Sequence, residues 1–141
     1  ASMVFHSYNQ AKEKGQVKLF KSHKEGYSDG EQLRDFVYIK DVVSVMSWLV
    51  KNSNVSGVYN LGTGKARSFY DLSKNTLISA GKEPVIEFVD MPEDLRGKYQ
   101  YFTEANMDKL KKAGYSKEFY SLEDGVKDYV ENYLAKEDSY L

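Results

Sequence analysis

The chain contains no cysteine, and its positive and negative charges nearly cancel. Without cysteine there can be no disulfide and no thiolate-bound metal, which is typical of proteins that work in the reducing cytosol. Twenty basic residues against 21 acidic ones give a net charge of −1, so no overall field attracts nucleic acid. No apolar run approaches the roughly 20 residues that cross a bilayer. These absences predict a cytoplasmic protein that binds neither nucleic acid nor a membrane.

Histidine is also scarce, with His6 and His23 as its two occurrences. Neither stands in a cluster of other metal-binding side chains, so no metal site is expected. Hydrophobic residues make up 41% of the chain and aromatic residues 14%, which is enough to build a core. We therefore predict a single domain over residues 1–141 with no bound metal.

Apolar periodicity and turn residues predict a mixed α/β fold with short strands and about five helices. Ser68-Phe-Tyr-Asp71 and Ser121-Leu-Glu-Asp124 have the form of capping boxes, which mark helix starts. Residues 21–33 form a long polar stretch with glycines, and we interpret it as a mobile lid over a binding site. The expected helices cover residues 1–14, 41–51, 68–80, 104–113 and 122–135, and the expected strands cover residues 16–20, 36–39, 57–61, 85–89 and 96–102.

The most informative segment is Arg34-Asp-Phe-Val-Tyr-Ile-Lys-Asp41, in which an arginine precedes a short β-branched and aromatic run. A guanidinium group at the entrance to a strand can bind a phosphate or carboxylate through two parallel hydrogen bonds, because its donors form a planar fork. A surface ion pair of Arg34 with Glu31 or Asp35 is the structural alternative, and spacing alone favours it. The residues by themselves leave both interpretations open.

Several segments together resemble the nucleotide-sugar-modifying extended short-chain dehydrogenases of the NAD-dependent epimerase/dehydratase family. Residues 34–41 are similar to the R-D-[FY]-[VI]-[YH]-x-x-D signature, residues 58–64 to the Y-N-L-G-T-G turn, and residues 96–100 to a late substrate-contacting strand. Within this family, Val4-Phe5-His6 and residues 19–23 are similar to epimerases that act on ADP-heptose. The resemblance implies an isomerase that uses NADP, acts on an ADP-sugar in lipopolysaccharide heptose synthesis and assembles as a homo-oligomer.

The resemblance also implies which side chains contact the ADP-sugar. In the family the arginine of the signature reaches the diphosphate, and Arg34 matches it. Phe20 is expected to stack on the adenine while Lys21 or His23 neutralises phosphate, although Phe20 is equally compatible with a core position at a strand end. Tyr99 is expected to bond a sugar hydroxyl. The expected substrate-binding residues are His6, Phe20, Lys21, Ser22, His23, Arg34 and Tyr99.

Two motifs of the family are missing from the sequence. The dinucleotide-binding turn is G-x-x-G-x-x-G, and Gly62-Thr-Gly64 fails as a substitute because Arg67 stands where the third glycine would pack. Residues 8–12 and 70–74 have the bare spacing of the catalytic Y-x-x-x-K pair, but we interpret them as ordinary pairs one helical turn apart.

From these missing motifs we expect the C-terminal substrate-binding part of a longer epimerase. Its Rossmann domain, cofactor-binding residues and catalytic residues would lie upstream, and the chain alone would be inactive. A dehydratase or reductase of the same superfamily is one alternative. A non-catalytic sugar-nucleotide-binding module is another.

Overall fold

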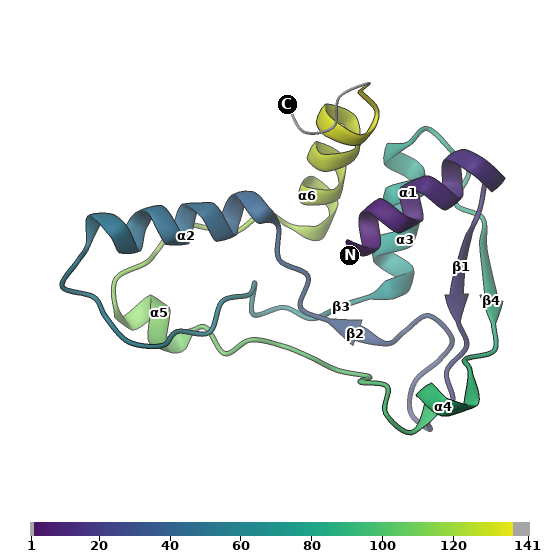
Figure 1. Cartoon of the computed structure of the whole chain (residues 1–141), viewed down its shortest axis with the longest axis horizontal. Helices are drawn as coiled ribbons and strands as arrows, with labels where there is room; N and C mark the ends of the chain where they lie inside the picture. The colour runs from purple at the N-terminus through teal and green to yellow at the C-terminus, as the bar shows by residue number, and fades with distance from the viewer. Residues whose placement is uncertain (1, 137–141) are drawn as a thin grey trace.

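Two small sheets and six α-helices make up the part of the chain that the structure describes, residues 2–136 of a computed structural model (Figure 1). The strands are β1 (Val17–Phe20), β2 (Leu33–Arg34), β3 (Arg67–Ser68) and β4 (Ile86–Val89). Strand β1 pairs in parallel with β4, and β2 pairs antiparallel with β3. The helices are α1 (Met3–Lys14), α2 (Ile39–Lys51), α3 (Phe69–Ser79), α4 (Glu93–Arg96), α5 (Asp108–Lys112) and α6 (Leu122–Tyr129), which continues as a π-helix over Val130–Leu134. The α/β class expected from the sequence is confirmed.

Helix α1 packs against α3 and β1 and forms the first core of the molecule with them. It begins at Ser2, whose hydroxyl accepts a backbone N–H of the first turn. It ends at Gly15, where a φ of 70° lets the chain turn into β1. Ala11 of α1 and Leu77 of α3 are fully buried between these elements. The predicted end at Gly15 is therefore confirmed, while Ala1 lies outside the described residues.

Helices α2 and α5 enclose a second core, at the opposite end of the molecule from β1 and β4 (Figure 1). Val45 of α2 is buried there against Leu110 of α5 and the ring of Tyr115. Another face of α2 carries large apolar side chains that remain exposed to solvent. They are Ile39, Val43, Met46 and Val50. Their spacing of four, three and four residues places them along one stripe of the helix.

Three of the expected strands do not form within the described residues, because a strand exists only where its backbone pairs with another. Over residues 36–39 the prediction is wrong, since the pairing occurs earlier, in β2, and α2 already begins at Ile39. Residues 57–61 have a strand-like composition but no strand beside them. Over residues 96–102, α4 occupies the start, and Tyr101 then meets β2 through a single backbone bond to the Leu33 N–H, at 2.8 Å.

The helix predictions are correct in kind and differ at their ends. Ser68 and Ser121 both cap helices as expected, each accepting the N–H of the residue three positions later. The helix predicted over residues 104–113 shortens to Asp108–Lys112, and the Ala105 N–H before it donates to a side chain. The last predicted helix keeps its extent but widens into a π-helix over its final turn.

The side chain that accepts the Ala105 N–H is the carboxylate of Asp35, which joins three distant segments. One oxygen accepts the N–H and the hydroxyl of Thr63, at 2.8 and 2.6 Å. The other accepts the N–H groups of Gly64 and Ala105, at 2.9 and 3.0 Å. Burial acts to raise the pKa of Asp35, but these hydrogen bonds outweigh it and lower the pKa below its ordinary value. Residues 62–64 thus form a structural turn around an ionised carboxylate.

Residues 2–136 contain no helix long and apolar enough to cross a membrane. Over the same residues, no three histidine, aspartate or glutamate side chains are placed to hold a metal ion.

The Asp35 turn generates a first prediction. A Cβ at position 62 would lie 2.5 Å from the Oδ2 of Asp35 and 2.7 Å from the Cβ of Ala105, so these atoms would have to move. Gly62→Ala is therefore expected to lower the free energy of unfolding by about 1–3 kcal/mol. Gly97→Ala is the matched control, because Gly97 has a φ of −80° and nothing within 4 Å of the added carbon. Urea unfolding that gives both variants equal stability would contradict this account of the turn.

Asp128 ties helix α6 to the beginning of α2. One oxygen of its carboxylate accepts the Tyr38 hydroxyl at 2.7 Å and lies 2.6 Å from the Lys40 ammonium group. The other accepts the side-chain amide of Asn132 at 2.7 Å. The hydrogen bond from Lys40, followed by that from Tyr38, lowers the pKa of Asp128 to about 2.

This lowered pKa predicts a stability change in acid. An unfolded aspartate has a pKa of about 3.9, so ionised Asp128 stabilises the fold above roughly pH 4, and the stabilisation is lost as the pH falls towards 2. Asp128→Asn is expected to flatten the pH dependence of the free energy of unfolding in this window. Urea titrations at several pH values would measure it, with exposed Asp94→Asn on α4 as the control. If Asp128→Asn kept the parent's slope, the contacts of Asp128 would not contribute to stability.

Candidate functional site

Arg34 lies among aromatic rings at the end of β2. Its guanidinium carbon is 5.4 Å from the ring centroids of both Phe69 and Tyr99. One of its nitrogens donates to a neighbouring backbone carbonyl at 2.9 Å. No carboxylate within residues 2–136 forms an ion pair with it, so the alternative of a pair with Glu31 or Asp35 is not what the structure shows. The fork of donors is held in place by packing rather than by an opposite charge.

Tyr99, one of the two rings beside Arg34, meets two further rings edge to face, which is a favourable arrangement for aromatic pairs. Tyr99 packs against Phe20 at the end of β1, with ring centroids 6.3 Å apart, and against Tyr101 at 5.4 Å. Burial raises the pKa of Tyr99, although the nearby charge of Arg34 acts to lower it. The hydroxyl therefore stays protonated and can donate a hydrogen bond. The fold thus brings together three of the expected site residues, Phe20, Arg34 and Tyr99.

The residue opposite Arg34 in the β2–β3 ladder is a second arginine, Arg67. Two opposed residues of an antiparallel pair lie on the same face, so like charges meet here. Arg67 has its own carboxylates, because it forms ion pairs with Glu123 and Asp71. The hydrogen bond that Arg67 donates to Glu123 is the main cause that raises the pKa of Arg67. Arg34 has no such compensation among the described residues, and its surroundings favour an anion.

Lys21, Ser22 and His23 follow directly on β1, beside Phe20. The Lys21 ammonium group is 3.7 Å from the carboxylate of Asp90, a pair that is largely exposed and therefore weak. The Ser22 hydroxyl donates to a carbonyl two residues ahead, at 3.0 Å. The ring of His23 accepts the N–H of buried Met91 through Nε2, at 3.3 Å. Ser22 and His23 therefore hold their own segment in shape, a role that sequence reasoning missed.

The expected lid, residues 21–33, is anchored more firmly than its composition suggests. Gln32 is 1% exposed and donates to the Phe20 carbonyl at 3.3 Å. Gly30 is buried, and a side chain there would meet the ring of Phe88 at 2.7 Å. The N–H of Ser22 donates to Asp29 at 2.7 Å, which closes the segment on itself. These contacts define its resting position, and its mobility stays a prediction.

His6 stands apart from this cluster. It is exposed on α1, where its ring meets that of Phe5 with centroids 6.0 Å apart. Within residues 2–136, no hydrogen bond, ion pair or ring contact joins it to Arg34 or Tyr99. Of the expected site residues, it is the one whose placement gives no support to a shared site.

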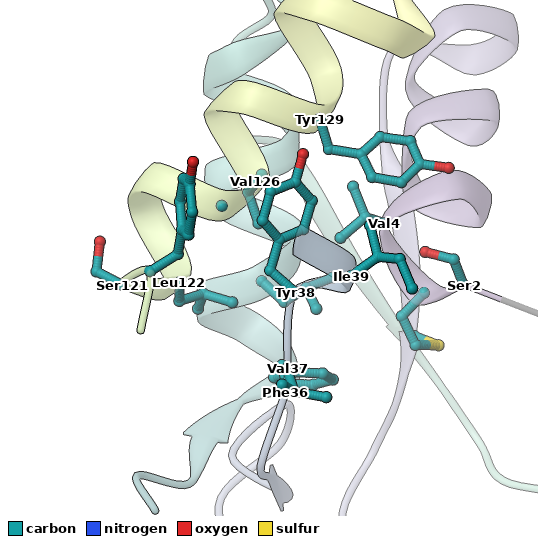
Figure 2. A pocket seen from close by; sticks show the side chains of 14 residues that line it. Ser2, Val4, Phe36, Val37, Tyr38, Ile39, Ser121, Leu122, Val126 and Tyr129 are labelled. Atoms are coloured by element: carbon teal, nitrogen blue, oxygen red, sulfur yellow. The ribbon is translucent and has the colours of Figure 1, made fainter. Parts of the chain in front are cut away.

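A cavity of about 430 Å³ opens between the start of α1, residues 36–39 and α6. Figure 2 shows Tyr38 and Val4 pointing into the same space, with the Tyr129 ring above and Phe36 below. Its lining is mainly apolar with hydroxyl groups and without a cation, so it is unsuited to a diphosphate. Phe36 connects the two regions, because its ring also packs against Phe69, at 5.6 Å.

The Gly-Thr-Gly turn offers no cradle for a dinucleotide. The N–H groups of Thr63 and Gly64, which could otherwise hold a phosphate, both donate to Asp35. The space beside Gly62 is filled by the same carboxylate and by Ala105. These residues do not fit a nicotinamide dinucleotide, in agreement with the missing third glycine.

Comparison with known proteins identifies relatives that are similar to the chain. Residues 1–62 match the family model described as "NAD dependent epimerase/dehydratase family". The chain is 64% identical over its full length to ADP-L-glycero-D-manno-heptose-6-epimerase of Fusobacterium nucleatum, of which it covers 44%. It is 52% identical over 99% of its length to the protein of that name from Nitratidesulfovibrio vulgaris, of which it covers 43%.

One solved structure is also similar to the chain. The crystal structure of Helicobacter pylori ADP-L-glycero-D-manno-heptose-6-epimerase is similar to 94% of the chain, with a TM-score of 0.70 and 32% sequence identity. The chain covers 37% of that structure, so it spans less than half the length of all three relatives. Residues 1–62 thus match this family model, and the whole chain is similar to one part of these epimerases.

Proposed function

We propose that this chain is the substrate-binding part of an ADP-L-glycero-D-manno-heptose 6-epimerase, which acts in the synthesis of lipopolysaccharide heptose precursors. The observation that carries the proposal is Arg34, a half-buried cation with no carboxylate partner in the described residues, held by the rings of Phe69 and Tyr99. The names of the curated relatives support the choice of ADP-heptose as the substrate.

Each part of an ADP-sugar has a chemical counterpart in the cluster. The guanidinium of Arg34 forms two parallel hydrogen bonds with the diphosphate, and its charge offsets that of the phosphates. Phe20, at the end of β1, offers a ring face to the adenine, with Lys21 next to it. Tyr99 provides a protonated hydroxyl for the sugar. His6, Ser22 and His23 remain candidate contacts, although His23 already uses its Nε2 internally.

The chemistry of epimerisation belongs to groups outside this chain. A nicotinamide cofactor, which we propose to be NADP, would supply the hydride chemistry from that other part of the protein. The Gly62–Gly64 turn does not fit this cofactor, and the chain contributes by positioning the sugar nucleotide, which fixes the reacting carbon in a productive orientation. We further propose that the complete protein is a homo-oligomer.

Arg34→Lys tests the proposed diphosphate contact in the complete gene product. A lysine keeps the charge but loses the planar fork, so the Michaelis constant for ADP-heptose is expected to rise by the equivalent of about 1–3 kcal/mol. Stability should fall by less than about 1 kcal/mol, from the lost contacts with the two rings. Steady-state kinetics and thermal unfolding measure the two effects separately.

Arg67→Lys is the matched control for that experiment. Arg67 lies opposite Arg34 in the ladder, but its fork is already used by Glu123. This variant is expected to lose stability while its Michaelis constant stays unchanged. If Arg34→Lys behaved like Arg67→Lys, Arg34 would be a structural residue and the proposed site would be wrong.

A second test uses the 141-residue chain by itself. Asp35 closes the glycine turn, and we interpret neither Y-x-x-x-K sequence of the chain as a catalytic pair. The chain is therefore expected to show no epimerisation and no tight NADP(H) binding. Calorimetric titration with NADPH and with ADP measures the two affinities, and binding of ADP should be weak because the chain supplies only one part of the proposed site. Sub-micromolar NADPH binding by the chain would contradict the assignment.

A further inference from the structure

Tyr101 contacts the 21–33 segment at both of its ends. It is 5% exposed, and its hydroxyl accepts the backbone N–H of His23 at 3.0 Å. Its backbone carbonyl accepts the N–H of Leu33 at 2.8 Å, where the segment enters β2. One buried residue from a distant part of the chain thus fixes where the segment begins and where it ends.

The ring of Tyr101 connects the middle of the same segment to the Arg34 cluster. On one side it packs against Tyr27, with centroids 5.2 Å apart, and the Lys24 ammonium group lies 5.6 Å from both rings. On the other side it meets Tyr99 edge to face at 5.4 Å, and Tyr99 supports the guanidinium of Arg34. A continuous set of ring contacts therefore runs from the segment to the proposed diphosphate site.

Two polar groups of His23 are already used by contacts within the protein. The His23 N–H is used by Tyr101, and its Nε2 is used by Met91. With His23 fixed at both points, the adjoining Lys21 and Ser22 are held at the end of β1. A flexible segment in this place would have to be ordered by the ligand, and that ordering lowers affinity.

We propose that Tyr101 is a positioning residue, which holds residues 21–33 against the Arg34–Tyr99 pair so that the nucleotide site is preformed before the ADP-sugar binds. The hydroxyl of Tyr101 fixes the segment by accepting the His23 N–H, and the ring of Tyr101 connects the segment to Tyr99. This inference rests on the proposed function, because it assigns Tyr101 a part in the affinity for that substrate. Tyr101 itself need not touch the ligand.

Tyr101→Phe in the complete gene product tests the inference, because it removes the hydroxyl and keeps the ring. The Michaelis constant for ADP-heptose is expected to rise about threefold to tenfold, as one lost hydrogen bond allows, with kcat unchanged. Hydrogen exchange at the His23 amide, measured without ligand, is expected to accelerate together with that of its neighbours.

Tyr115→Phe is the matched control, since Tyr115 is 6% exposed and its hydroxyl is bonded to the Ser44 hydroxyl at 3.0 Å in the other core. It should cost a similar amount of stability and leave both the Michaelis constant and exchange at His23 unchanged.

Three outcomes would overturn the inference. The first is faster exchange at His23 with an unchanged Michaelis constant, which would make Tyr101 a purely structural residue. The second is an equal rise of the Michaelis constant in both variants. The third is a parent protein that neither binds nor converts an ADP-sugar, which removes the proposed function and the inference with it. The first two leave the proposed function intact, so the failures are distinguishable.

Discussion

The carboxylate of Asp35 is the interaction on which the proposed site depends. It accepts four hydrogen bonds from Thr63, Gly64 and Ala105, and so fixes the segments on either side of β2. Asp35 is also the carboxylate next to Arg34 in the sequence. Here both oxygens are already engaged, and Arg34 stays without a carboxylate partner among residues 2–136. The same bonds that close the turn therefore leave the cation available to a ligand.

The rings of Phe69 and Tyr99 stabilise the charge of Arg34. A half-buried guanidinium without a counter-charge loses solvation, and the faces of Phe69 and Tyr99 offset part of that loss. They also restrict the long side chain of Arg34, so less freedom is lost when an anion binds. Arg67 shows the contrasting solution on the same ribbon, because its ion pairs with Glu123 and Asp71 consume its donors. Arg34 and Arg67 thus have different roles, because their neighbours differ.

Sequence reasoning succeeded where the determinants are local. Capping serines and a terminal glycine fixed the helix ends at Ser68, Ser121 and Gly15, because these signals act within one helical turn. It failed for three of the five expected strands, since pairing depends on what lies alongside, and residues 57–61 have no strand paired with them within residues 2–136. Family resemblance rather than spacing assigned Phe20, Arg34 and Tyr99 to one site, and the structure places Tyr99 in contact with the other two, while their role in binding stays a proposal. The contribution of Tyr101 could not be foreseen, because its hydroxyl bonds to a backbone group 78 residues away.

The exposed stripe on α2 has a practical consequence for any preparation of these 141 residues. Val50 is 81% exposed, and beyond the helix Val58 is 84% exposed, next to an extended segment whose backbone is not paired in a sheet. Surfaces that combine exposed apolar side chains with an unpaired backbone edge are prone to association, because contact removes both from water at once. Concentrated solutions of the isolated chain would therefore tend to self-associate through this end. Dilution would restore the monomer without any change at the Arg34 cluster, which lies on a different part of the fold.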